Sequence, residues 1–227
     1  MQRYNYNTSP KGKTAQLYIK YLFDFIFSLC GVIILSPLYL ITLILIKIFM
    51  PGPVFFKQKR VGRDGVEFEI LKFRTMKVDR EAEKNLDFSK DSMRLTKLGK
   101  ILRRTKIDET AQLLNVLMGN MSLVGPRPTV MEQVEKYTAF QYRRLEVRPG
   151  MTGLAQVNGN IALSWDERIT YDVMYIDNYS LWLDIKILFK TVLIVLLGEQ
   201  RFYNKPSLTY TADKQEHTEN YVKAVHK

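Results

Sequence analysis

Residues 25–46 read FIFSLCGVIILSPLYLITLILI, an apolar stretch without a formal charge that is interrupted near its middle by Ser36 and Pro37. A straight helix of this length rises about 33 Å, which is enough to cross a hydrocarbon core of roughly 30 Å. Pro37 has no N–H to donate to the carbonyl of Ile33, and its ring crowds that carbonyl, so we expect the helix to break or bend there. The hydroxyl of Ser36 can satisfy a freed backbone acceptor. The stretch allows two interpretations, a membrane-spanning helix and a re-entrant hairpin of two shorter helices.

Basic residues flank this stretch on both sides. They are Arg3, Lys11, Lys13 and Lys20 before it, and Lys47, Lys57, Lys59, Arg60 and Arg63 after it. Under the positive-inside tendency, a spanning helix would place one of these flanks on the wrong side of the membrane. A hairpin that enters and returns keeps both flanks on the cytoplasmic side, so we favour the hairpin. The stretch also starts too late, and lacks the small-residue cleavage site, for a removable signal peptide.

The composition narrows the classes of function. The 227 residues carry a formal net charge of +11, which suits anionic lipid headgroups, nucleic acid or a phosphorylated substrate. Cys30 is the single cysteine, and both histidines, His217 and His226, lie in the polar C-terminal region. The sequence therefore offers no disulfide or cysteine-metal framework and no plausible histidine base.

The rest of the chain has room for one modest globular domain. Two β-prone runs, residues 54–61 and 66–73, flank a turn at 62–65 and predict a β-hairpin. Apolar residues at helical spacing predict helices over residues 101–118 and 165–179. Helices are also expected over the basic and aromatic residues 137–146 and over the mainly apolar residues 181–198. The uncharged part of the last helix is too short to cross a bilayer, so we expect that helix to lie in the membrane interface or to pack on the domain.

The predicted fold class is α+β and predominantly helical. It combines a helix-break-helix membrane hairpin with one small globular domain that carries a β-hairpin and interfacial amphipathic helices. The predicted boundaries are an N-terminal segment at 1–17, the re-entrant hairpin at 18–50, the globular domain at 51–200 and a polar C-terminal tail at 201–227.

Asp108 and Glu109 form an adjacent carboxylate pair inside the most basic part of the chain. One interpretation is structural: Thr105 caps a helix with Asp108 three residues on, and the carboxylates lie at the positive end of the helix dipole. The other is chemical: a carboxylate held at a helix N-terminus among arginines keeps a low pKa, so it can attack phosphorus or hold a divalent cation. Mg²⁺ is usually bound through one or two carboxylates plus substrate phosphates, which this pair can supply.

Six motifs occur in a fixed order between residues 18 and 198. They are SP at 36–37, GPVFF at 52–56, KFRTM at 72–76, DE at 108–109, GPRP at 125–128 and RPGMTGLAQVNG at 148–159. No single motif is specific, but together they closely resemble the bacterial sugar transferases, the monotopic polyprenol-phosphate phosphoglycosyl transferases. Two departures from that pattern flank the carboxylate pair: Thr110 and Ala111 replace the common Leu-Pro, and Asn120 stands where an acidic residue is usual.

The resemblance implies an enzyme of the bacterial inner membrane, with its catalytic domain on the cytoplasmic face. Such an enzyme transfers a sugar 1-phosphate from a UDP-sugar to undecaprenyl phosphate and releases UMP. The product would enter capsule, exopolysaccharide, O-antigen or glycoprotein glycan assembly, with downstream glycosyltransferases as possible partners. No residue pattern singles out the sugar, because donor choice depends on the shape of the pocket.

Carried over residue by residue, the resemblance implies that Asp108 is the nucleophile that forms an aspartyl phosphosugar, and that Glu109 and Asp108 are ligands of a Mg²⁺ cofactor. The predicted substrate-binding residues are Lys72, Arg74, Arg103, Arg127, Arg148 and Asp172. Guanidinium groups suit a diphosphate and the charge on a leaving UMP, because they are planar bidentate donors. Arg143 and Arg144 are expected to be solvated or to face lipid headgroups.

Two other classes of function fit parts of the sequence. A nucleic-acid binder could use the basic charge together with tyrosines such as Tyr137 and Tyr142 for backbone contacts and stacking. A non-catalytic membrane adaptor needs only the apolar hairpin and a basic surface. Neither has a use for Asp108 and Glu109, so we prefer the enzyme.

Overall fold

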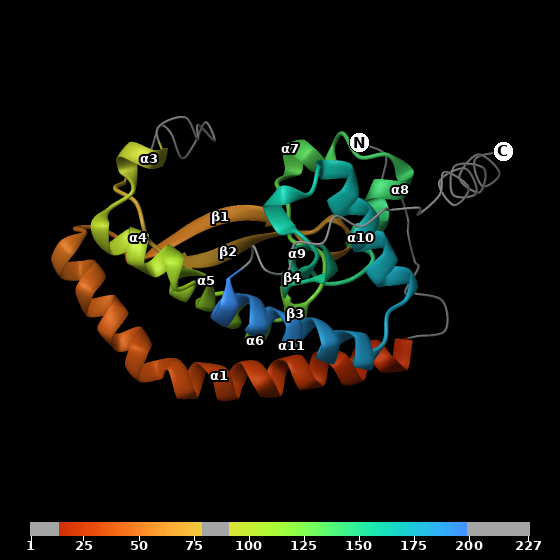
Figure 1. Cartoon of the computed structure of the whole chain (residues 1–227), viewed down its shortest axis with the longest axis horizontal. Coiled ribbons are helices and arrows are strands. Elements are labelled where there is room, and N and C mark those ends of the chain that lie inside the picture. The colour runs from red at the N-terminus through yellow and green to blue at the C-terminus, as the bar shows by residue number, and fades with distance from the viewer. Residues whose placement is uncertain (1–13, 79–90, 199–227) are drawn as a thin grey trace.

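The computed structural model describes residues 14–78 and 91–198. Helix α1 (Thr14–Phe49) runs along one side of the molecule, and the other elements pack on it (Figure 1). Among the described residues, α1 is the one helix long and apolar enough to cross a membrane. Only 11% of its most apolar window is buried within the protein. Residues 1–13 of the predicted N-terminal segment lie outside the described residues, as does the whole predicted tail at 201–227.

The predicted helix-break-helix pattern is wrong in one respect, because α1 does not end at Ser36 and Pro37. Pro37 lies inside the helix, and the ribbon changes direction along its length without interruption (Figure 1). The hydroxyl of Ser36 donates to the carbonyl of Ile33 at 2.8 Å, the acceptor that Pro37 leaves without its usual N–H. A helix whose lost bond is replaced in this way bends instead of breaking.

Two small sheets follow. Strands β1 (Phe55–Val61) and β2 (Glu67–Phe73) pair antiparallel around the 3-10 turn η1 (Arg63–Gly65), which confirms the predicted β-hairpin. Strands β3 (Ser122–Val124) and β4 (Gly150–Thr152) pair in parallel and form a second sheet that the sequence did not predict. This second sheet requires a glycine at position 150, because a Cβ there would collide with the backbone of Gly125.

The single helix predicted over 101–118 is wrong. The structure has three short helices there, α4 (Lys97–Arg104), α5 (Ile107–Thr110) and α6 (Leu113–Leu117). The chain turns between α4 and α5 at Lys106, whose φ of 58° is left-handed. The buried apolar residues of this segment, among them Leu102, Ala111 and Val116, therefore reach the core from different short helices and turns, whereas Ile101 and Met118 are exposed.

The remaining helices largely follow the sequence. Residues 165–179 and 181–198 form α10 (Trp165–Asp177) and α11 (Leu181–Leu197), which begin at the capping serines Ser164 and Ser180. The helix predicted over 137–146 is shorter, and consists of α8 (Ala139–Tyr142) and the 3-10 turn η2 (Arg143–Leu145). The other short elements are α3 (Asp91–Arg94), α7 (Met131–Val134), α9 (Leu154–Val157) and η3 (Asn160–Ala162).

Both ends of α1 belong to the core. Near its start, Leu17 packs in one apolar cluster with Tyr179 and Ile187, and Lys20 pairs with Asp184 of α11 at 2.8 Å. Near its end, Ile46 packs in a second cluster with residues of β2, α4 and the segment after α5. The apolar helix is therefore an integral part of the globular fold, and it fixes the position of the elements that carry the carboxylate pair.

Candidate active site

Asp108 and Glu109 lie on α5, directly after the turn at Lys106. Asp108 is 6% exposed, and its Oδ1 atom is buried without a hydrogen-bond partner among the described residues. Glu109 is held by two cations: its Oε1 accepts from Lys72 Nζ at 2.6 Å and from Arg127 Nη2 at 3.0 Å. The two neighbouring carboxylates thus have different environments, one unpartnered and one paired.

Lys72 is positioned by β2, and β2 is held to the helices by Asn115 of α6. The Asn115 side chain is fully buried; its Nδ2 donates to the carbonyl of Glu69 at 2.7 Å, and its Oδ1 accepts from the N–H of Leu71 at 2.9 Å. These two bonds satisfy the strand backbone immediately before Lys72. Asn115 is a residue that sequence reasoning missed, because its partners are more than forty positions away in the chain.

Two further contacts surround the pair. Arg103 of α4 donates from Nε to the hydroxyl of Thr75 at 3.0 Å, which places its charge on the side of Asp108. Tyr39 of α1, two positions beyond the proline, donates its hydroxyl proton to the carbonyl of Thr110 at 2.9 Å. The apolar helix therefore touches the end of the short helix that carries Asp108.

The two carboxylates titrate differently. Burial raises the pKa of Asp108, and the charge of Glu109 raises it further, against the opposing effect of Lys72, Arg103 and Lys106. Burial would also raise the pKa of Glu109, but Arg127 and Lys72 outweigh it and lower that pKa to about 2. The sequence predicted a low pKa for a carboxylate of this pair; the structure shows it for Glu109 and not for Asp108, because the cations contact the Glu109 carboxylate directly.

The capping interpretation of the pair is also wrong. Thr105 ends α4, where its hydroxyl donates to the carbonyl of Ile101 at 2.9 Å, so it does not cap the helix of Asp108. The N-cap residue of α5, directly before Ile107, is Lys106, which makes no side-chain capping bond. The predicted cap by Thr105 is therefore absent, although both carboxylates do lie in the first turn of α5.

The structure brings together five of the predicted site residues: Asp108, Glu109, Lys72, Arg103 and Arg127. The other three lie in different contacts. Arg74 is buried and donates to the carbonyls of Met50 and Pro51, so it ties the end of β2 to the end of α1. The Arg148 guanidinium lies 3.9 Å from the centre of the Tyr21 ring. Asp172 of α10 is 2% exposed and pairs with Arg144.

The prediction that Arg143 and Arg144 are solvated or face headgroups is wrong. Arg144 is buried because Asp172 pairs with it at 2.7 Å and aromatic rings cover it. Arg143 is partly buried and pairs with Asp177 at 2.6 Å. Asp172 was the sequence signal that could have predicted a buried arginine. An acidic residue among the apolar positions of a core helix needs a cation partner when it is buried.

The donors at the pair suit a hard divalent cation only with help from a substrate. No group of three or more histidine, cysteine or acidic side chains that could hold a metal occurs in the part of the chain that the structure describes. Two neighbouring carboxylates are available as ligands: that of Asp108, whose Oδ1 has no hydrogen-bond partner among the described residues, and the ionised one of Glu109. That donor set fits Mg²⁺, which is commonly held by one or two carboxylates together with substrate phosphates and water.

Comparison with known proteins shows the family of this chain. Residues 15–198 match the family described as bacterial sugar transferase. The chain is 48% identical over 184 residues to the sugar transferase EpsL of Bacillus subtilis, covering 80% of this chain and 89% of that protein.

Two longer relatives are also similar. The chain is 43% identical over 188 residues to the UDP-N-acetylgalactosamine-undecaprenyl-phosphate N-acetylgalactosaminephosphotransferase of Aeromonas hydrophila, covering 80% of this chain and 44% of that protein. It is 42% identical over 181 residues to the UDP-glucose:undecaprenyl-phosphate glucose-1-phosphate transferase of Klebsiella pneumoniae, covering 76% of this chain and 39% of that protein. The chain thus spans less than half the length of these two relatives. The match over residues 15–198 and the identity to EpsL show that this chain belongs to the bacterial sugar transferase family.

Proposed function

We propose that this chain transfers a sugar 1-phosphate from a UDP-sugar to undecaprenyl phosphate and releases UMP. The observation that carries the proposal is the arrangement of a buried, unpartnered Asp108 beside a Glu109 that Lys72 and Arg127 hold ionised. Two relatives have names that state a sugar-phosphate transfer involving undecaprenyl phosphate. A nucleic-acid binder or a non-catalytic adaptor explains neither the arrangement nor the family.

In the proposed mechanism the transfer has two steps. A carboxylate oxygen of Asp108 attacks the sugar-bearing phosphorus, a P–O bond to Asp108 forms, and the bond to the UMP oxygen breaks. The phosphate of the lipid acceptor then attacks the aspartyl phosphosugar and frees Asp108. Burial favours this role, because a poorly hydrated carboxylate with a raised pKa is more basic and binds an electrophile more readily.

The cations around the pair offset the negative charge of the donor. Lys72, Arg103 and Arg127 approach the carboxylates from β2, α4 and the corner at residues 125–128. Glu109 and Asp108 would hold Mg²⁺, which would supply further neutralisation of the diphosphate. Positive charge preorganised in a buried site is effective, because it needs no reorganisation during the reaction.

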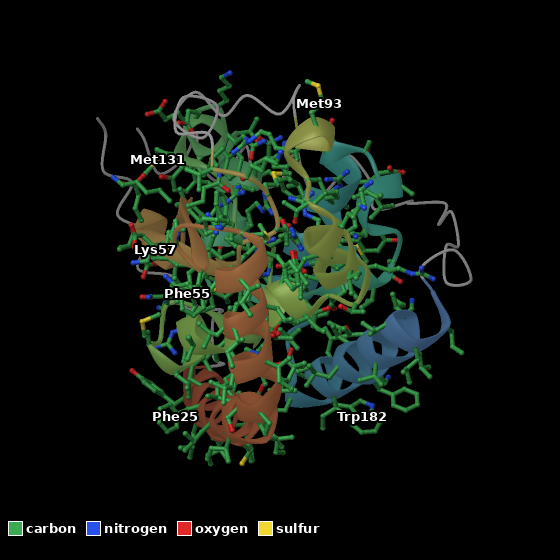
Figure 2. The ribbon with its side chains drawn as sticks, turned by 90° about the vertical axis from the view of Figure 1, so that its left-hand side faces the viewer. Phe25, Phe55, Lys57, Met93, Met131 and Trp182 are labelled. Atoms are coloured by element: carbon green, nitrogen blue, oxygen red, sulfur yellow. The ribbon has the colours of Figure 1, made fainter. Side chains whose placement is uncertain are left out.

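A membrane position is proposed from the exposed apolar side chains. Those of α11 recur at helical spacing: Trp182, Ile185, Phe189, Val192 and Leu196. Figure 2 shows Trp182 and Phe25 of α1 at the same, lower edge of the molecule, with Met93 of α3 at the opposite edge. We propose that this edge lies in the cytoplasmic leaflet of the inner membrane, with α1 re-entrant and α11 in the interface. In that orientation, the contact between Tyr39 and Thr110 supports a position of Asp108 near the membrane, within reach of the lipid phosphate.

The experiment that tests the mechanism uses radiolabelled UDP-sugar and Mg²⁺ without a lipid acceptor. A panel of UDP-sugars first identifies a donor by UMP release with undecaprenyl phosphate present. Without acceptor, the covalent route predicts label trapped on the protein and about one UMP per active site, both lost in Asp108→Asn. The matched control is Asp64→Asn, the same change at an exposed turn residue. If the wild type turns over but never retains label, and Asp108→Asn stays active, the lipid phosphate attacks directly and the carboxylates serve only the metal.

A further inference from the structure

Arg144 is the buried cation that connects α10 to the corner carrying Arg127. Its side chain is 4% exposed, and Nη2 pairs with Asp172 Oδ2 at 2.7 Å. The same Nη2 donates to the backbone carbonyl of Arg127 at 3.0 Å, and Nη1 donates to the hydroxyl of Tyr137 at 2.7 Å. The guanidinium also lies 5.3 Å from the centre of the Trp165 ring.

The contact with Arg127 completes the support of one short backbone segment. The carbonyl of Pro126 accepts from the N–H of Gly150 at 2.9 Å, and the carbonyl of Thr129 accepts from the N–H of Val61 at 2.8 Å. Arg144 holds the carbonyl between them. Each side of Arg127 is thus attached to a different sheet, and Arg127 itself is attached to α10 through Arg144.

The support matters because Arg127 reaches Glu109 with a side chain that is 49% exposed. A long exposed side chain finds one position only if its backbone is fixed. A small hollow lined by Arg127, Pro128, Thr129 and Arg144 adjoins the contact, so this side of the segment is not tightly packed by other side chains. A contribution to stability does not by itself explain why Arg144 and Asp172 are buried as a pair, since the desolvation of two buried charges offsets much of their attraction.

We propose that Arg144, held in place by Asp172, is a positioning residue that fixes the backbone of Arg127 so that its guanidinium meets Glu109 and the donor diphosphate. This inference rests on the proposed transferase function. It gives Asp172 a role behind the site, in place of the substrate contact that the sequence predicted. The effect passes from Asp172 to Arg144, then through the Arg127 carbonyl to its side chain.

The test compares Arg144→Lys and Asp172→Asn with the matched control Arg143→Lys. A lysine keeps the charge opposite Asp172 but cannot donate to three acceptors in the geometry of a guanidinium. Arg143 is the neighbouring arginine, and it forms ion pairs with Glu146 and Asp177, which lie outside the corner at 125–128. We expect kcat/KM to fall about tenfold or more in Arg144→Lys, typical of a lost charge-assisted hydrogen bond, and to be unchanged in Arg143→Lys.

A double-mutant cycle with Arg127→Ala separates positioning from general damage. If Arg144 acts through Arg127, Arg144→Lys causes no further loss of kcat/KM once the Arg127 side chain is absent. The affinity for UDP with Mg²⁺, measured by calorimetry on protein whose folding is checked by its melting curve, should show the same non-additivity. Equal losses from Arg144→Lys in the presence and absence of the Arg127 side chain would overturn the inference, as would wild-type kinetics in folded Arg144→Lys.

The two proposals fail in different ways. A wild-type protein that releases no UMP from any UDP-sugar and does not bind UDP overturns the proposed function and this inference with it. A wild-type protein that is active, with additive losses in the cycle, overturns only the role of Arg144. For Asp172→Asn, activity that falls less than in Arg144→Lys but remains coupled to Arg127 supports the order of action.

Discussion

The environment of Glu109 makes a quantitative prediction about stability. Its pKa is lowered from 4.5 to about 2, so the folded state favours its ionised form by about 3 kcal/mol, at 1.36 kcal/mol for each pKa unit. The side chain is 24% exposed, and solvent screening brings the expected value to about 2–3 kcal/mol. Glu109→Gln keeps the shape but removes this charge. We therefore expect its free energy of unfolding at pH 7, without Mg²⁺, to fall by about 2–3 kcal/mol.

The contribution of Glu109 to the free energy of unfolding should decrease as the pH falls. A carboxyl group with a lowered folded pKa contributes stability that is present above its unfolded pKa, here 4.5, and is lost as the pH falls through about 2. The difference between wild type and Glu109→Gln should therefore be largest at neutral pH, and should shrink to about half by pH 3.

The assay is urea unfolding in detergent with a chelator present, repeated from pH 7 down to pH 3. The matched control is Glu69→Gln, which removes a glutamate from an exposed pair with Lys57 at 3.2 Å. Exposed pairs contribute little, so we expect a change below about 1 kcal/mol there. A difference for Glu109→Gln that is absent at pH 7, or that stays constant down to pH 3, would refute the assignment of Glu109 as the ionised partner of Lys72 and Arg127.

Three further predictions concern the donor site, the membrane helix and the core. Arg127→Lys keeps the charge but loses the two-pronged guanidinium, so kcat/KM should fall by an amount that corresponds to a loss of about 1–3 kcal/mol of transition-state stabilisation. Unchanged turnover in both Arg127→Lys and Arg127→Ala would show that this arginine has only a structural role. In a Cys30→Ser background, single cysteines at residues 5 and 60 should both resist an impermeant thiol reagent added to intact cells, whereas labelling of one alone would establish a spanning helix. Asn115→Ala leaves two partly buried backbone groups of β2 without their side-chain partner and should lower the free energy of unfolding by about 1–3 kcal/mol, measured by urea titration.

Features that depend on neighbouring residues in the chain could be predicted from the sequence. The β-hairpin at 55–73 follows from β-prone runs around a glycine-rich turn. Helices α10 and α11 follow from apolar spacing and from serine caps at their starts. The carboxylate pair and the basic residues around it were identified by motifs in fixed order, whose residue types are themselves the chemistry. In each case the deciding interactions span a few residues.

Features that depend on distant residues were decided only by the tertiary structure. The segment 101–118 has a helical pattern, yet Lys106 adopts a left-handed conformation because the chain must turn to place Asp108 against β2 and α1. The parallel pairing of β3 with β4 joins residues 122 and 150, and no local pattern records it. A short strand of three residues also carries too little periodicity to be seen in a sequence.

The division is clearest at the site itself. The sequence by itself determined that the acidic pair Asp108 and Glu109 occurs in a basic part of a chain that also carries a long apolar helix. Charge and hydrophobicity are properties of single residues, so they can be read without the fold. Only the tertiary structure decided that Glu109 is the carboxylate paired with cations and that Asp108 Oδ1 has no hydrogen-bond partner among the described residues. It likewise decided that Arg144 is buried behind Arg127 rather than solvated. A pKa depends on burial and on charges a few ångströms away, and Lys72 and Arg127 reach Glu109 from positions far along the chain.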